Sequence, residues 1–313
     1  MIELQNFTKR YGDFTAVENL TLRIEPGELF GFIGPNGAGK STTIRFLVTL
    51  LQATSGQGFV GGFSVARQPM DVRRSIGYMP DAFGVYDGMK VWEFLDFFAA
   101  AYQIPQARRR TILNDVMELL DIGGKRDEQV SSLSRGMTQR LCLAKTLVHD
   151  PPVLILDEPT SGLDPRARLE IKALLRELRN MGKTILIASH ILTELADCCT
   201  SIGILERGKL LLHGPMDEVY RRIQSNRRVE ICFVAEQGRS NQERGVAILR
   251  KQPGFVDLQI DGAKVTAEIA ADEAALANVV DEFAREGVRF YSFADLDPTL
   301  EDVFMLVTKG AVN

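Results

Sequence analysis

A glycine-rich segment between residues 34 and 41 has the residue types and spacing needed to bind the phosphates of a nucleotide. It reads Gly-Pro-Asn-Gly-Ala-Gly-Lys-Ser and fits the pattern Gly-x-x-x-x-Gly-Lys-Ser/Thr at every fixed position. Glycines let the backbone curl so that its N–H groups point at phosphate oxygens. Lys40 can then reach the β- and γ-phosphates, and the Ser41 hydroxyl can be a ligand of Mg²⁺. The predicted contact residues are Gly34, Pro35, Asn36, Gly37, Ala38, Gly39, Lys40, Ser41 and Thr42.

Two adjacent carboxylates, Asp157 and Glu158, follow an apolar run at 153–156. Ligands of α/β proteins bind where parallel strands end, so we expect both carboxylates beside the phosphate loop. Asp157 is suited to hold Mg²⁺, directly or through water. Glu158 is one residue further and points elsewhere, so it can polarise an attacking water as a general base. The alternative is that the two acids only begin the turn at Pro159.

The elements that must position these residues form an α/β pattern from residue 1 to about 215. Three short, continuous apolar runs predict strands covered by helices on both faces, as in a parallel sheet, and they lie at 29–33, 153–156 and 184–188. An apolar helix is predicted from Ser41 to about Leu51. Asp164-Pro165 begins a further helix with an N-cap and a first-turn proline, and Gly182 ends it.

Residues from about 85 to 145 differ from this pattern, because they show helical spacing and few strand signals. The stretches 91–101, 111–120 and 138–148 read as helices. We therefore predict a helical subdomain inserted in the α/β core.

A second domain is predicted after Gly214-Pro215, with 216–227 as a linker and 228–313 as an accessory domain. Residues 216–223 read as a short helix within the linker. The domain then shows the order strand, helix, strand, strand, helix, strand at 229–234, 241–251, 256–260, 265–269, 272–286 and 288–293. Asp261-Gly262 is a strong signal for a hairpin turn. This order is that of a small α+β, ferredoxin-like fold, and Asp297-Pro298 predicts a last helix to about Val307.

The composition is that of an ordinary globular protein, with 45% hydrophobic and 25% charged residues among 313. A formal net charge of -4 argues against a surface built to wrap nucleic acid. No apolar run approaches the roughly 18 residues of a membrane-spanning helix, and the N-terminus lacks a secretory signal. We therefore expect a cytoplasmic chain. In that compartment the cysteines are expected to be unbridged; they are Cys142, Cys198, Cys199 and Cys232.

The segment from residue 1 to about 215 resembles an ATP-binding-cassette (ABC) ATPase, and its motifs come in the order found in that family. Residues 133–137, Leu-Ser-Arg-Gly-Met, match the family's signature motif, and residues 161–164, Ser-Gly-Leu-Asp, resemble its D-loop. His190 lies in the place of the switch histidine, and Tyr11 lies where the family stacks an aromatic ring on adenine. The resemblance implies a P-loop NTPase fold that hydrolyses ATP with Mg²⁺, with Glu158 and His190 as catalytic residues.

The resemblance also implies a dimer of cassettes, formed by two copies or with a related chain. In the family, the phosphate loop of one cassette faces the signature motif of the other. Ser134, the Gly136 N–H and the following helix N-terminus would form a second anion site. The same resemblance implies that Asp164 of the D-loop is a nucleotide-binding residue.

Three residues depart from the family pattern. Arg135 replaces the common glycine, and we expect its charge to favour a bound phosphate. Met137 replaces a glutamine, which leaves that contact open. Asp81, at the end of Gly-Tyr-Met-Pro-Asp, replaces the glutamine of the family's Q-loop. Asp81 is either a nucleotide contact and further Mg²⁺ ligand or a loop residue that does not touch the nucleotide.

The tail, including residues 300–304, resembles the accessory domain of ABC-2-type exporters, among them multidrug export systems. The resemblance implies export through a separate ABC-2-type membrane permease, with this chain peripheral on the cytoplasmic face of the cell membrane. In the family, a coupling helix of the permease docks after the Q-loop, which points to Phe83–Trp92 here. The alternative is a soluble ABC ATPase that acts on ribosomes or DNA. That class usually carries two cassettes or a long coiled coil in one chain, so no nucleic acid is expected as a partner.

Overall fold

The computed structural model forms two compact units, Met1–Met216 and Asp217–Asn313, and each is described by itself. The structure describes residues 1–82, 84, 86, 88–191, 197–223, 227–234, 241–296 and 303–304, without the side chains of 221–223. Phe83 of the predicted docking segment lies outside this part of the chain. So does the predicted last helix, apart from residues 303 and 304, which are helical.

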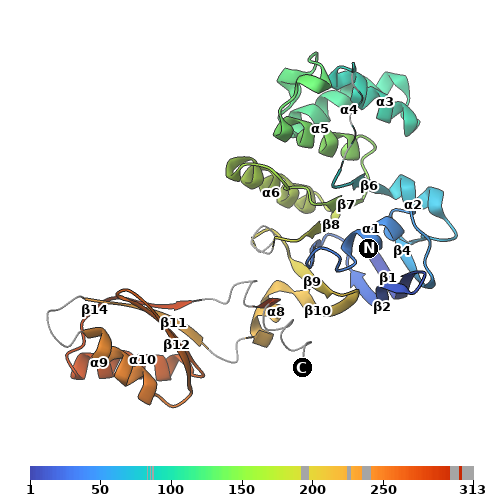
Figure 1. Ribbon diagram of the computed structural model, residues 1–313. Coiled ribbons are helices and arrows are strands. Elements are labelled where there is room, and N and C mark those ends of the chain that lie inside the picture. Colours follow the sequence, from blue (N-terminus) through green and yellow to red (C-terminus); the bar gives the residue numbers. More distant parts are fainter. Residues whose placement is uncertain are drawn as a thin grey trace. The chain divides into compact units, whose positions relative to one another are not determined.

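A six-stranded sheet lies at the centre of the first unit (Figure 1). In spatial order its strands are β10 (Lys209–Pro215), β9 (Ser201–Glu206), β3 (Leu29–Ile33), β8 (Thr184–Ser189), β7 (Val153–Asp157) and β6 (Ile76–Met79). All neighbours pair in parallel except β10, which is antiparallel to β9. Every residue of β3, β7 and β8 is buried, which confirms the prediction from their continuous apolar runs.

A four-stranded antiparallel sheet and helix α1 complete the part of the unit nearest the N-terminus (Figure 1). The strands, in spatial order, are β2 (Phe14–Ile24), β1 (Ile2–Tyr11), β4 (Ser55–Val60) and β5 (Phe63–Ser64), and α2 (Pro69–Ser75) follows them. One hydrophobic core joins both sheets through α1 (Lys40–Leu47). In it, the rings of Phe7 and Phe46 stack at 4.3 Å between centroids. The prediction that α1 reaches Leu51 was wrong, because Thr49 has φ 67°, which a right-handed helix does not allow.

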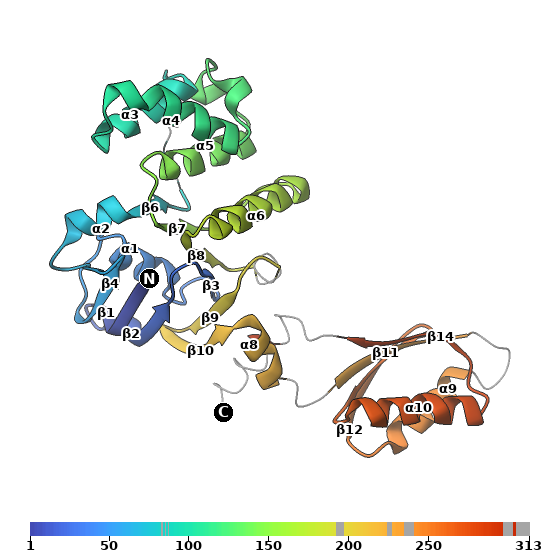
Figure 2. The same cartoon turned by 180° about the vertical axis from the view of Figure 1, so that it is seen from behind.

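Helices α3 (Val91–Ala101), α4 (Gln106–Leu119) and α5 (Arg135–Leu147) pack together as a separate layer, which both views show beyond β6 and β7 (Figure 1, Figure 2). The chain enters this layer after β6 and leaves it into β7, so the helices are inserted between two paired strands. Two short 3₁₀ turns, Gly123–Lys125 and Val130–Ser132, connect α4 to α5.

Two further helices have N-caps that explain where they begin. Helix α5 begins three residues before the predicted Thr138, because the Ser134 hydroxyl accepts the Met137 N–H at 3.4 Å as an N-cap. Helix α6 (Pro165–Asn180) begins as predicted, with Asp164 as N-cap and proline in the first turn.

The second unit has the predicted βαββαβ order. Its elements are β11 (Arg227–Phe233), α9 (Asn241–Lys251), β12 (Phe255–Asp261), β13 (Lys264–Ile269), α10 (Glu273–Arg285) and β14 (Phe290–Leu296). The sheet order is β12-β13-β11-β14, with every pair antiparallel. Alternate residues of β11 and β13 are buried, and both helices cover one face of the sheet (Figure 2). The ferredoxin-like prediction is confirmed, including the turn at Gly262, which has φ 58°.

The short helix predicted after Pro215 is α8 (Met216–Ile223). Among the described residues, no helix is both long and apolar enough to cross a membrane. All four cysteines are free thiols, and three of them are buried.

Candidate nucleotide-binding site

A cavity of about 410 Å³ lies where β3, β7 and β8 end. Parallel strands bring their carboxyl ends to the same edge of a sheet, so segments far apart in sequence meet there. The lining residues are Tyr11, Phe14, Ala16, Pro35, Asn36, Gly37, Ala38, Gly39, Lys40, Ser41, Thr42, Asp81, Asp157, Glu158, Ser161 and His190. The cavity therefore brings together most of the site residues predicted from the sequence.

The loop after β3 is shaped by glycines and closed by Lys40. Gly37 and Gly39 have φ values of 81° and 107°, a region that glycine adopts without the strain a side chain would add. The buried Lys40 ammonium donates to the carbonyl oxygens of Gly34, at 2.5 Å, and Pro35, at 3.2 Å. Burial lowers the pKa of Lys40, and the carboxylates of Glu158 and Asp157 partly offset that effect. The loop thus holds a positive charge beside the cavity.

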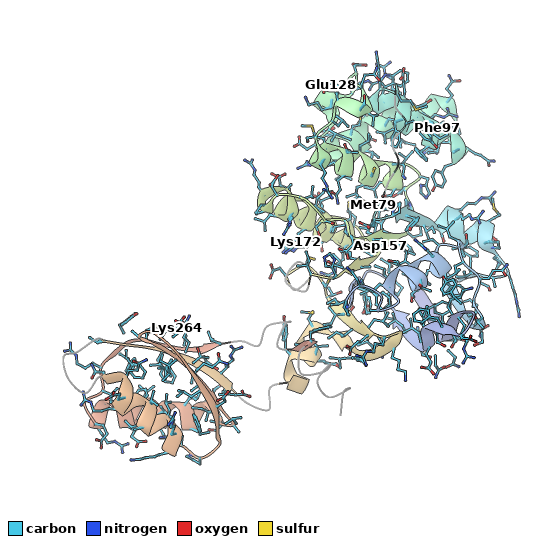
Figure 3. All side chains as sticks on the ribbon, viewed as in Figure 1. Met79, Phe97, Glu128, Asp157, Lys172 and Lys264 are labelled. Atoms are coloured by element: carbon cyan, nitrogen blue, oxygen red, sulfur yellow. The ribbon has the colours of Figure 1, made fainter. Side chains whose placement is uncertain are left out.

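Asp157 lies at the end of β7, below the layer of α3, α4 and α5 in the view of Figure 3, where it is labelled near Met79 of β6. Burial raises the pKa of Asp157, a hydrogen bond from the Ser41 hydroxyl lowers it, and the charges of Glu158 and Asp81 raise it further. A divalent cation would relieve this accumulation of negative charge. The described residues contain no group of three or more histidines, cysteines and acids that could hold a metal. Mg²⁺ still fits beside Ser41 and Asp157, because this ion needs only one or two protein ligands when phosphate oxygens supply the others.

The end of β8 holds the carboxylate of Glu158 through several hydrogen bonds. Its Oε1 accepts the backbone N–H of His190 at 3.0 Å and lies 2.7 Å from His190 Nδ1. The Ser189 hydroxyl donates to Oε2 at 3.3 Å. Glu158 also has φ 52°, a region that is sparsely populated by non-glycine residues and recurs at active sites. The side chain is therefore oriented by its neighbours rather than free in solvent.

Tyr11 and Phe14 face each other across the turn between β1 and β2, where they are paired residues. Both rings line the cavity although they are 47% and 65% exposed. The Lys9 ammonium lies 5.1 Å from the centre of the Tyr11 ring. Three lining residues were not predicted as site residues: Phe14, Ala16 and Ser161. Phe14 could have been found from the sequence, because Gly12-Asp13 is a two-residue turn signal that pairs Phe14 with Tyr11.

Four predicted nucleotide contacts are not among the residues lining this cavity. Gly34 contributes its carbonyl to Lys40 instead. Ser134 caps α5, and Gly136 lies in the first turn of the same helix. Asp164 caps α6, where it accepts the Ala167 N–H at 2.9 Å. Within their own chain Ser134 and Asp164 cap helices, and neither they nor Gly136 line the nucleotide cavity.

Sequence comparison matches residues 17–161 to the model of the ABC transporter family. The daunorubicin resistance ATP-binding protein DrrA3 of Streptomyces coeruleorubidus is 31% identical over 98% of this chain and 95% of its own length. The probable multidrug ABC transporter ATP-binding protein YbhF of Escherichia coli (strain K12) is 36% identical over 70% of this chain. The match spans only 38% of YbhF, and it spans 58% of the Synechocystis protein sll0415, which is also 36% identical.

Solved structures of ABC cassettes align with part of this chain. The ATP-binding subunit of an ABC transporter aligns with a TM-score of 0.66 at 28% identity, over 72% of this chain and 93% of that one. The MJ0796 cassette, described as a dimeric bacterial ABC transporter cassette, aligns with a TM-score of 0.63 at 26% identity. That match covers 69% of this chain and 99% of MJ0796.

Proposed function

This chain belongs to the ABC transporter family, and on that premise we propose that it hydrolyses ATP to drive export through a separate membrane permease. One observation carries the proposal: Lys40, Asp157 and Glu158 line a single cavity together with His190. A cation for phosphates, a buried ligand for Mg²⁺ and an oriented base are the parts that phosphoryl transfer to water needs. The relatives named for multidrug transport and for daunorubicin resistance support export as the direction.

Mg·ATP would bind along the length of this cavity. The adenine would stack on Tyr11 and Phe14, because two exposed aromatic rings at a cavity mouth offer an apolar surface to a planar base. The phosphates would lie against the backbone N–H groups of the loop and the Lys40 ammonium. Ser41 and Asp157 would hold Mg²⁺, and the ion would offset the charge of the phosphates.

Hydrolysis would proceed by in-line attack of water on the γ-phosphorus. Glu158 accepts the proton of that water, and the bond between the γ-phosphorus and the ADP oxygen breaks to give ADP and inorganic phosphate. His190, held 2.7 Å from Glu158 Oε1, would keep the carboxylate and the water in position. Preorganised groups of this kind lower the barrier because they do not reorient during the reaction.

A second cassette would complete the site. Ser134, Gly136 and Asp164 do not line the cavity of their own chain, which suits a role toward the nucleotide of a partner, either a second copy or a related chain. The dimeric description of the MJ0796 cassette supports this arrangement. We propose residues 1–215 as the ABC ATPase domain, 216–227 as a linker and 228–313 as an accessory domain.

The permease, which we propose is of the ABC-2 type, would dock at residues 83–92 on the cytoplasmic face of the membrane. In the described part of that segment, Tyr86 is 50% exposed and meets the Phe97 ring edge-on at 5.5 Å between centroids. We expect Tyr86→Ala and Trp92→Ala to keep ATPase activity and to lose membrane association. Unchanged association of both variants would rule out this docking surface.

The proposal is tested by a pull-down from detergent-solubilised membranes, with Glu158→Gln and Mg·ATP to hold the closed dimer. We expect a protein with several membrane-spanning segments to be recovered, and Lys40→Ala under the same conditions to recover less of it. Recovery of only ribosomal proteins, or of nothing, would contradict transport and favour the alternative of an ABC ATPase that acts elsewhere. ATPase activity, measured separately, would stand in either case.

A further inference from the structure

Asp81 and Arg135, the acidic and the basic departure from the family pattern, line one small cavity beside the nucleotide site. This second cavity has a volume of about 290 Å³ and is lined by Asp81, Ala82, Arg135, Thr138, Gln139, Glu158 and Ser161. Asp81, Glu158 and Ser161 also line the larger cavity. The two departures therefore share a space that adjoins the proposed catalytic carboxylate.

The two residues belong to different parts of the first unit. Asp81 follows β6, whose last residue, Met79, pairs with Leu156 next to Asp157 (Figure 3). Arg135 is the first residue of α5, in the helical layer. A contact between them would link the segment that leaves the sheet with the helix that carries the signature motif.

The Arg135 guanidinium already lies on the D-loop of its own chain. Its Nη2 donates to the Ser161 carbonyl at 3.4 Å. A Cβ at Gly162 would meet the Arg135 guanidinium, and Gly162 has φ 70°, which favours glycine, so the guanidinium lies directly against the D-loop backbone. Arg135 is exposed, and its guanidinium lies on the loop that follows Glu158.

Lys40 lines the larger cavity, and Arg135 is the cationic residue that lines the smaller one. Three carboxylates, those of Asp81, Asp157 and Glu158, line the two cavities, and the phosphates of ATP would add more negative charge. The charge of Asp81 is felt at Asp157, whose pKa it helps to raise. Among the residues lining the smaller cavity, Arg135 is the one that carries a positive charge. A neutral Gln and Gly, the usual residues of the family, would need no such compensation.

We propose that Arg135 is the counter-charge of Asp81, and that the two act as a pair of positioning residues. The pair would hold the segment after β6, the first turn of α5 and the D-loop around Glu158 during hydrolysis. This inference rests on the proposed ATPase function. The two departures from the family pattern are then one compensated change rather than two separate defects.

A double-mutant cycle tests the pair, using Asp81→Gln, Arg135→Gly and the double variant that restores the usual residues of the family. We expect each single variant to lower kcat/KM for Mg·ATP by about 10-fold, since each leaves one charge without its partner. The double variant should return to within about 3-fold of wild type, whereas independent effects would multiply to about 100-fold. Arg135→Lys, which keeps the charge, should also stay within about 3-fold.

The matched control is Arg110→Gly, an exposed arginine on α4 that lines neither cavity. Its glycine lies inside a helix and costs at least as much stability as one at the first position of α5, so it reports on destabilisation alone. We expect its kcat/KM to be unchanged. If Arg135→Gly does not fold, the same cycle is run with Arg135→Ala and Asp81→Asn.

Losses that multiply in the double variant, or single variants without effect, would overturn the pair. A shift in the Mg²⁺ requirement of Asp81→Gln that persists in the double variant would assign Asp81 to the metal instead. These outcomes differ from failure of the proposed function, which would appear as a wild-type protein without Mg·ATP hydrolysis.

Discussion

Replacement of Glu158 by glutamine isolates its chemical role, because the substitution keeps the shape of the side chain and removes its charge. In the structure, Oε1 accepts from the His190 backbone N–H and lies next to His190 Nδ1, while Oε2 accepts from Ser189. A glutamine oxygen can still accept from His190, and its amide can donate to the Ser189 hydroxyl. The position of the side chain should therefore be retained, while its capacity to accept a proton is lost.

General bases contribute about 10²- to 10⁴-fold to a reaction rate, which corresponds to ~2.7–5.4 kcal/mol in the activation free energy. We expect kcat of Glu158→Gln to fall by about 10²-fold or more. Its dissociation constant for Mg·ATP should change by less than about 3-fold, because the phosphate loop and Lys40 are intact. Release of inorganic phosphate gives kcat, and a fluorescent nucleotide analogue gives the affinity.

The control is Glu177→Gln, the same chemical change at an exposed position of α6 that lies outside the nucleotide cavity. It should leave both constants unaltered. The reasoning is refuted if Glu158→Gln keeps more than about a tenth of the wild-type kcat. It is also refuted if the loss is entirely in affinity, since the carboxylate would then act in binding rather than in proton transfer.

Three further outcomes follow from burial. Asp157→Asn removes a carboxylate whose pKa is raised chiefly by burial. Loss of about 1 kcal/mol of destabilisation should raise the melting temperature of the nucleotide-free protein by ~2–4 °C. Its stabilisation by Mg·ATP should shrink in the same melts. Wild type gains stability as the pH falls through that raised pKa, so the difference in melting temperature between variant and wild type should disappear at acidic pH. A difference that does not change with pH would contradict burial of the charged carboxylate as its cause. Burial raises the pKa of Cys142 to about 12, so iodoacetamide at pH 8 should label Cys142 only after denaturation, as peptide mass spectrometry can show. Phe283 is fully buried and meets the Phe233 ring edge-on at 5.8 Å, so Phe283→Ala should lower the unfolding free energy of the second unit by about 3–5 kcal/mol. An unchanged denaturant midpoint would show that this core does not hold the unit together.

Much of the local structure followed from the sequence, because its signals lie within a few neighbouring residues. Continuous apolar runs predicted β3, β7 and β8, and the Asp261-Gly262 turn signal predicted the hairpin of β12 and β13. The phosphate loop could be recognised because all its fixed positions lie within residues 34–41. The ends of predicted elements were less accurate: Thr49 ends α1 early, Ser134 begins α5 early, and α4 begins at Gln106 rather than at 111. Several strands of the first unit, among them β1 and β2, were not predicted.

The tertiary structure decided which of these segments meet. Strand order β10-β9-β3-β8-β7-β6 places His190 against Glu158 and the phosphate loop beside both, although their sequence spacing specifies no such order. Phe14 joined the cavity through the pairing of β1 with β2, and Arg135 reached Gly162 through the packing of the helical layer. The physical reason is that motifs and periodicity express local backbone and side-chain preferences. Strand order and contacts between distant segments depend instead on packing free energy summed over the whole core, and no short stretch of sequence contains that sum.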